Sequence, residues 1–144
     1  MTRTVIVVDR ELPTGLAANA AAVVALSLGA ALPHLPGGDF TDAAGETHRG
    51  LIPFGLPVLG ARPSEMARLR REAGEHRDVV VVDFPALGHT TNDYEEFQQR
   101  VAGSPAEELL YAGIGLHGPF PVVRELTRRL SLLRDGARRD PEPV

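Results

Sequence analysis

Two short runs of consecutive β-branched residues dominate the hydrophobic pattern of the chain. They are Val5–Val8 and Val79–Val82, and neither alternates with polar residues. Uninterrupted apolar runs of this length are typical of strands that are covered on both faces. Further strands are predicted at Leu109–Leu116 and at Pro57–Leu59. Because helical segments separate these strands, the pattern predicts an α/β protein.

The first predicted helix is unusual because it is apolar almost all round. It runs from about Thr14 to Gly29, after a turn marked by Pro13 and Gly15. Such a helix is either deeply buried or faces a second chain. The apolar stretch Leu16–Leu35 carries polar residues, glycine and proline, whereas about 20 strongly apolar residues are needed to cross a bilayer. We therefore expect a helix of a cytoplasmic protein and no membrane partner.

Three further helices are predicted from apolar residues at helical spacing. The second covers about Pro63 to His76 with one apolar stripe and a wet opposite face. The third follows Thr90 and Thr91, either of which suits an N-cap, and its side chains Tyr94, Phe97 and Val101 are spaced to face the core. The fourth starts by Pro119, with apolar residues on one side as far as Leu133.

The remaining segments have little regular pattern. Within residues 36–55, Phe40–Asp42 followed by Thr47–His48 predicts a small hairpin. The tail from Asp135 to Val144 is polar and contains two prolines, so we predict that it is disordered. We therefore expect a single α/β domain over residues 1–134.

Composition narrows the possible chemistry. The chain has 144 residues, a net charge of −4, no cysteine and no lysine, so all 15 of its basic residues are arginine. Disulfides, thiolate chemistry and cysteine zinc sites are excluded, and so are Schiff-base chemistry and a lysine-dependent phosphate loop. The acidic balance argues against nucleic acid as the main partner. The N-terminus lacks the regions of a secretory signal, which again indicates the cytoplasm.

Two stretches carry a family resemblance. Leu12–Ala22, directly after the first strand, and Tyr111–Pro119, followed by Leu126-Thr127, resemble a family of small bacterial proteins labelled domain of unknown function number two thousand. That family is grouped by fold with the second, archaeal and eukaryotic class of peptidyl-tRNA hydrolases. The resemblance implies a three-layer α/β/α sandwich with a small mixed, mostly parallel sheet, and often a homodimer.

The catalytic residues of those hydrolases have no match in this chain. Their lysine in the first helix falls where this chain reads Leu16-Ala17-Ala18, and their histidine one turn later falls near Ala25. Their Asp-Ala-Gly and the following threonine find no match in Arg100–Glu108. Peptidyl- or aminoacyl-tRNA hydrolysis is therefore the least favoured function, since a fold does not carry an activity without its site.

Acidic residues end both valine-rich strands and suggest a candidate site. In open α/β sheets ligands bind beyond the carboxyl ends of parallel strands. If the two strands are parallel neighbours, Asp9 and Asp83 flank that crevice, where paired carboxylates can act as acid and base or bind a divalent ion. The alternative is that each acid caps the turn that follows it.

Other candidates lie near the predicted helix starts. His117 and Gly118 precede the last helix, where an anion can bind and a histidine can transfer a proton, although the glycine also suits close packing. Thr14, Gly15 and Asn19 belong to the first helix and are candidate ligand contacts, with a structural asparagine as the alternative.

No metal site or cofactor is expected, because no histidine pair has metal-ligand spacing. We therefore predict a protein that binds or acts on a small molecule in the strand-end crevice, with Asp9, Asp83 and His117 as the catalytic candidates. The alternative is a non-catalytic homodimeric interaction protein that uses the apolar first helix as its interface. Whether the protein is an enzyme stays open.

Overall fold

A computed structural model describes residues 1–134, which form one five-stranded mixed sheet in the order β5-β6-β1-β4-β7. The strands are β1 (Thr2–Asp9), β4 (Val58–Ala61), β5 (Val80–Pro85), β6 (Tyr111–Pro119) and β7 (Ser131–Leu132). Of the four neighbouring pairs, β1–β4 is parallel and the other three are antiparallel. The mixed α/β class is thus confirmed, but the expected mostly parallel pairing is wrong, because β6 runs in the opposite direction between β1 and β5.

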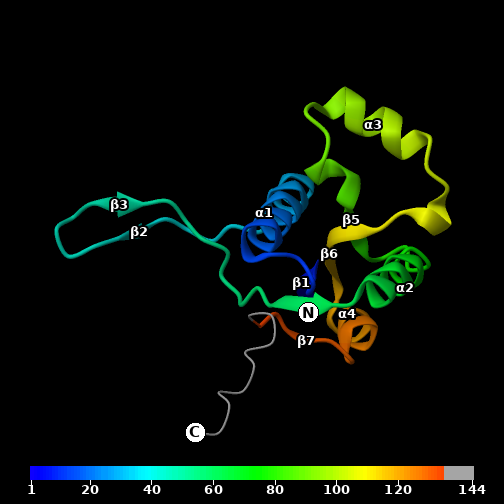
Figure 1. Cartoon of the computed structure of the whole chain (residues 1–144). Coiled ribbons are helices and arrows are strands. Elements are labelled where there is room, and N and C mark those ends of the chain that lie inside the picture. The colour runs from blue at the N-terminus through cyan, green and yellow to red at the C-terminus, as the bar shows by residue number, and fades with distance from the viewer. Residues whose placement is uncertain (135–144) are drawn as a thin grey trace, which may run out of the picture.

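Helices cover both faces of this sheet and give three layers (Figure 1). Helix α1 (Thr14–Ala31) packs on one face, and α2 (Pro63–Ala73) and α4 (Phe120–Thr127) pack on the other. Helix α3 (Tyr94–Ala102) lies outside these layers, between the short 3-10 turns η1 (Ala86–His89) and η2 (Ala106–Glu108). Alternate residues of β1 belong to the two cores, with Val5 and Val7 facing α2 and α4, and Ile6 and Val8 facing α1.

Helix α1 buries only one narrow stripe. Its buried residues are Ala17, Ala20, Val24 and Leu28, which recur at helical spacing. Its opposite side remains apolar and exposed, so the expectation of deep burial is wrong and the second expectation, a face for another chain, is left open. Among the described residues α1 alone is long and apolar enough to cross a membrane, a criterion that core helices of soluble proteins also meet.

Two glycines of β6 let α1 approach the sheet closely. A Cβ atom on Gly115 would lie 2.7 Å from Val24 Cγ1, and one on Gly113 would lie 3.1 Å from Val24 Cγ2. Both distances are shorter than ordinary van der Waals contact. The Gly-Ile-Gly segment therefore sets how closely the second half of α1 packs on the sheet.

Three elements differ from their predicted form. Strand β5 lies at the sheet edge and is only partly covered, so the inference of two covered faces holds for β1 and not for Val79–Val82. Helix α4 ends at Thr127, short of the predicted Leu133, and Ser131–Leu132 instead form β7, which pairs with β4. Asp93, rather than Thr90 or Thr91, caps α3 by accepting a hydrogen bond from the Glu96 amide, and Tyr94 is exposed.

The predicted hairpin forms the tip of a projecting arm, residues 36–55 (Figure 1). Its strands are β2 (Phe40–Thr41) and β3 (Thr47–His48), which pair in antiparallel register. The arm leaves the body on the side of α1 and extends well beyond it. The tail predicted to be disordered lies outside the described residues.

Candidate functional site

The two strand-end acids lie where β1 and β5 end, on the same side of the sheet, but they do not form a pair. Strands β1 and β5 point the same way, and β6 lies between them. Asp83 stands opposite Ile114, which stands opposite Val7, so Asp9 is two residues further along. Two strand spacings amount to about 10 Å. Carboxylates that share a proton are about 3 Å apart, so this edge does not hold the expected acid pair.

Each acid instead has a local partner. Asp9 Oδ1 accepts a hydrogen bond from the Glu11 amide, as expected of a residue that caps the turn after the strand. Asp83 Oδ2 accepts one from Arg70 Nε of α2 at 2.7 Å. Burial raises the pKa of the neighbouring Tyr111 hydroxyl, and the negative charge of Asp83 raises it further. The two acids therefore serve a turn and a helix–strand ion pair.

The other predicted site residues do not join these acids. His117 stands opposite Thr4, near the start of β1, whereas Asp9 lies at the end of β1. His117 is therefore at the opposite end of the strands from Asp9 and Asp83. Gly118 packs against the segment that leads into β5, because a Cβ atom there would lie 2.9 Å from the Asp78 carbonyl oxygen. That contact leaves no space for a ligand.

The three candidates in α1 are also separated from His117. Thr14 and Gly15 lie exposed in the first turn of the helix, where no side chain caps the helix. Asn19 lies on the exposed side, so it does not need a buried hydrogen-bond partner. The strand register thus places His117 away from Asp9 and Asp83, while Thr14, Gly15 and Asn19 lie exposed on α1.

His117 belongs to a buried polar pair on the α1 face of the sheet. Its Nδ1 lies 2.8 Å from the Thr4 hydroxyl oxygen, and both side chains are buried. The ring of His34, from the segment after α1, meets the His117 ring edge to face at 6.3 Å. Adjacent cross-strand residues thus place a hydroxyl and an imidazole side by side within an otherwise apolar layer.

Thr4 connects this pair to a cavity of about 310 Å³, which we call the α1 cavity. The cavity lies between β1, the second half of α1 and the root of the arm. Its lining is Thr4, Ile6, Ala25, Leu26, Leu28, Gly29, Ala30, Leu35, Pro36, Ile52, Phe54 and Leu56. Among these lining residues, Thr4 is the one with a polar side chain. Apolar cavities with few convergent polar groups are typical of small-molecule sites.

The surroundings of His117 favour the neutral form of its ring. Burial lowers its pKa below the ordinary value of 6.5, and the nearby charge of His34 lowers it further. A neutral imidazole has one donor and one acceptor nitrogen. Hydrogen-bonded to such a ring, the Thr4 hydroxyl keeps one free donor or acceptor position, depending on the ring tautomer. The pair can therefore bind either a carbonyl or a hydroxyl group.

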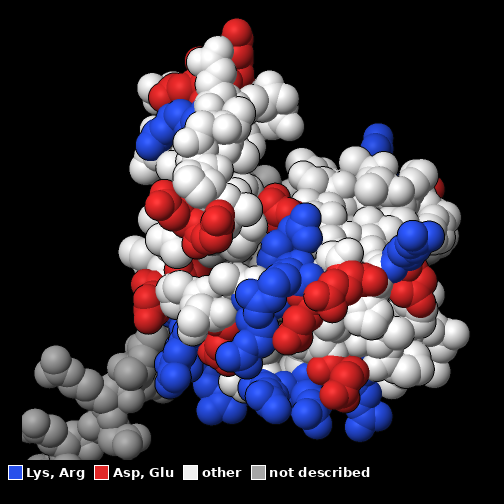
Figure 2. Space-filling model, turned by 90° about the vertical axis from the view of Figure 1, so that its right-hand side faces the viewer, with Lys and Arg blue, Asp and Glu red and all other residues white. Residues whose placement is uncertain are grey.

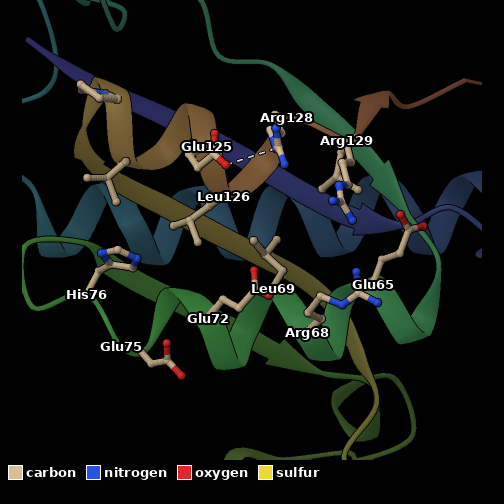
Figure 3. A pocket seen from close by; sticks show the side chains of 13 residues that line it. Glu65, Arg68, Leu69, Glu72, Glu75, His76, Glu125, Leu126, Arg128 and Arg129 are labelled. Atoms are coloured by element: carbon tan, nitrogen blue, oxygen red, sulfur yellow. Dashed lines mark ion pairs between the residues drawn. The ribbon is translucent and has the colours of Figure 1, made fainter.

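A second hollow, larger and more polar, runs between α2 and α4 (Figure 3). It measures about 690 Å³ and has an apolar floor that includes Leu69 and Leu126. Acids and arginines alternate along its rims, and Arg128 pairs with Glu125 at 3.2 Å. Figure 2 shows the same mixture, with a band of basic side chains flanked by acidic ones. Arginines that lie among acidic side chains on the same helices are typical of solvated helix faces.

Sequence reasoning missed most of the α1 cavity. Thr4 and Ile6 looked like ordinary strand residues, and the arm residues Ile52 and Phe54 belonged to an irregular segment. The available signal was the alternation of β1 and β6, which places Thr4 beside His117 once their antiparallel register is known. Among residues 1–134 no group of three or more acids and histidines is placed to bind a metal ion.

Comparisons with known proteins indicate a fold and a family. The structure is similar to that of a protein of unknown function, Atu0240 from Agrobacterium tumefaciens strain C58, with a TM-score of 0.83 and 16% identity. The similarity covers 91% of this chain and 96% of the other. At this identity it establishes the fold alone. No curated protein matches the chain in sequence. The family described as Protein of unknown function (DUF2000) matches residues 2–134, and the chain belongs to that family.

Proposed function

We propose that the protein binds a small, mainly apolar molecule in the α1 cavity. The observation that carries the proposal is the buried Thr4–His117 pair, because Thr4 is one of the residues that line an otherwise apolar cavity. A volume of about 310 Å³ lies at the lower end of the range of about 300–1,000 Å³ found for ligand pockets. Such a cavity suits a compact ligand.

The chemistry of the wall defines the ligand class. Among residues 1–134 no charged side chain lines the cavity, so a charged ligand buried there has no compensating partner in this part of the chain. The neutral Thr4–His117 pair instead offers one hydrogen bond. We therefore propose a ligand with an aliphatic or aromatic body and a single hydroxyl or carbonyl group. This proposal keeps the expected small-molecule function, but it places the ligand near the start of β1 rather than in the crevice beyond the carboxyl ends of the strands.

Binding is favoured over turnover. An imidazole that acts as a base is usually oriented by a third group on its other nitrogen. The ring that meets His117 is His34, and no carboxylate contacts it among the described residues. The pair thus supports recognition of a polar group, and catalysis is not part of the proposal.

Native mass spectrometry with a matched pair of variants tests this function. Gly29 lines the cavity and Gly15 does not, and a Cβ atom on either meets nothing within 4 Å. Gly29→Leu should fill the cavity, whereas Gly15→Leu makes the same change in the same helix elsewhere. We expect a co-purified mass that disappears on denaturation in the wild-type and Gly15→Leu proteins but not in Gly29→Leu. A wild-type protein of bare chain mass, or an excess that persists in Gly29→Leu, would contradict the proposal.

The family resemblance supports a finer proposal about fold and setting. We propose the fold of the second class of peptidyl-tRNA hydrolases without its activity, in a cytoplasmic bacterial protein. The support is the order of the Gly-Ile-Gly, Gly-Pro and Leu-Thr motifs, together with the absence of lysine. A peptidyl-tRNA hydrolysis assay should give the background rate, and a rate well above background would overturn the second half of this proposal.

A further inference from the structure

The exposed side of α1 is a continuous uncharged surface. Helix α1 contains no charged residue over its 18 positions. Leu26 is 78% exposed, and Leu16 and Val23 are exposed by 40% and 37%. Large apolar side chains gathered on one face indicate a contact surface, whereas isolated ones do not. We call this surface the α1 face.

The arm adds a second apolar surface beside the α1 face. Phe40, Leu51 and Phe54 are exposed along it. Leu26 of the α1 face and Phe54 of the arm root also line the α1 cavity, so the two surfaces meet at its mouth. Figure 1 shows that the arm leaves the body on this side and extends past α1.

The arm holds its shape through its own contacts. At its root the Gly37 amide donates to the Leu51 carbonyl at 2.7 Å, and the Gly50 amide donates to Asp39 at 2.9 Å. At its tip His48 bonds Asp42 at 2.8 Å and stacks on Phe40 at 5.1 Å. An ordered hairpin with exposed apolar side chains is suited to contact another molecule.

We propose that the α1 face and the arm together bind a second copy of this chain in a two-fold symmetric dimer. In such an interface each surface meets the same surface, or the adjacent one, of the partner. The polar residues of the exposed side, Asn19 and Ser27, can both donate and accept, so each is able to pair with its own copy. With no charge on the helix, the part of the contact between the two α1 helices buries no like-charge pair.

The area required for a stable dimer involves both surfaces. A helix of 18 residues is about 27 Å long and about 10 Å wide, so its outer side offers roughly 270 Å². A stable interface needs about 800 Å² from each partner. The helix alone is therefore too small, and the arm has to supply most of the remainder. This requirement predicts that shortening the arm dissociates the dimer.

Cysteine cross-linking tests the arrangement directly, because the chain has no cysteine of its own. Ala22 lies on the exposed side of α1, and Ala67 lies on the exposed side of α2. Two cysteines form a disulfide only when their Cα atoms lie within about 7 Å. We expect mild oxidation of Ala22→Cys at micromolar concentration to give a covalent dimer, and Ala67→Cys to remain monomeric. Equal cross-linking of the two variants would overturn the proposal.

Sedimentation equilibrium supplies the independent measurement. The wild-type protein should have the mass of a dimer, and Leu26→Glu should be a folded monomer. Leu110→Glu changes a leucine of similar exposure, 62%, outside both surfaces and should remain dimeric. Replacing residues 38–49 by a short glycine linker should also give a monomer, since Gly37 and Gly50 already touch.

A wild-type monomer at 100 µM would overturn the proposal, as would a monomer that binds phosphatidylcholine vesicles through α1. Val23 belongs to the α1 face but does not line the α1 cavity, so loss of the dimer in Val23→Glu with the co-purified ligand retained would separate this inference from the proposed function.

Discussion

Substitution of Gly115 by alanine tests the close packing of α1 on β6. The new Cβ atom would lie 2.7 Å from Val24 Cγ1, 3.3 Å from Leu28 Cδ2 and 3.6 Å from Ile6 Cδ1. Val24, Leu28 and Ile6 are all fully buried, so no flexible side-chain end can move aside into solvent. The helix must therefore shift outward or Val24 must adopt a poor rotamer.

The expected loss of stability follows from these contacts. Inserting one carbon into a well-packed core costs about 1–3 kcal/mol. The contact at 2.7 Å is with the nearer methyl of a fully buried valine, so we expect about 2 kcal/mol for Gly115→Ala. Val24→Ala alone should also cost about 2 kcal/mol, because it leaves a cavity. In the double variant the two changes compensate in volume, so its loss should be smaller than the sum by at least about 1 kcal/mol.

Urea unfolding at one fixed protein concentration measures these losses, because association would otherwise change the apparent stability. Gly15→Ala is the control, since its Cβ atom meets nothing within 4 Å and alanine favours the helix by about 0.5–1 kcal/mol. Additive losses in the double variant, or a Gly115→Ala protein as stable as the wild type, would refute the reasoning.

Three further predictions concern the polar groups. Burial lowers the pKa of His117, so as the pH falls below about 6.5 the unfolded chain binds a proton that the folded chain does not. The contribution of His117 to stability is therefore complete above that pH and declines below it. We expect the urea midpoint of His117→Gln to fall less steeply between about pH 7 and 5 than that of the wild type. Asp83→Asn should cost less than about 1 kcal/mol, since its ion pair with Arg70 is partly exposed, and a loss above about 2 kcal/mol in thermal unfolding would contradict this. Asp9→Asn and Asp83→Asn should retain the co-purified ligand in native mass spectrometry, whereas retention in Gly29→Leu with loss in the aspartate variants would return the site to the strand-end crevice.

The layers of the fold could be predicted from local pattern. The valine run after Thr4 is a central strand, and short apolar segments between turn residues gave the positions of β4 and β6. Strand order could not be predicted in this way, because β6 enters the sheet between β1 and β5 from the distant end of the chain. The same limit applies to β7 (Ser131–Leu132), because Leu130 and Leu133 on either side of it continue the helical spacing of α4 although the segment pairs with β4.

The candidate site was harder to predict than the fold. His117 was found from its position beside Gly118, yet its partner Thr4 lies 113 residues away and becomes visible only through the antiparallel register. The apolar character of α1 was recognised, but composition alone does not tell burial in a core from exposure to a partner. In this structure α1 buries a narrow stripe that ends at Leu28, and the opposite side of the helix is exposed.

Titration of the isotope-labelled protein with 1-octanol, followed by NMR, tests the central claim most directly. This probe combines an apolar chain with one hydroxyl group, as the wall of the α1 cavity requires. We predict saturable shifts of the Thr4 methyl and His117 ring signals, with the signals of Asp9 and Asp83 unchanged, and no response at Thr4 in Gly29→Leu. Unchanged Thr4 and His117 signals at saturating octanol, or shifts confined to the edge of the sheet that holds Asp9 and Asp83, would contradict the account.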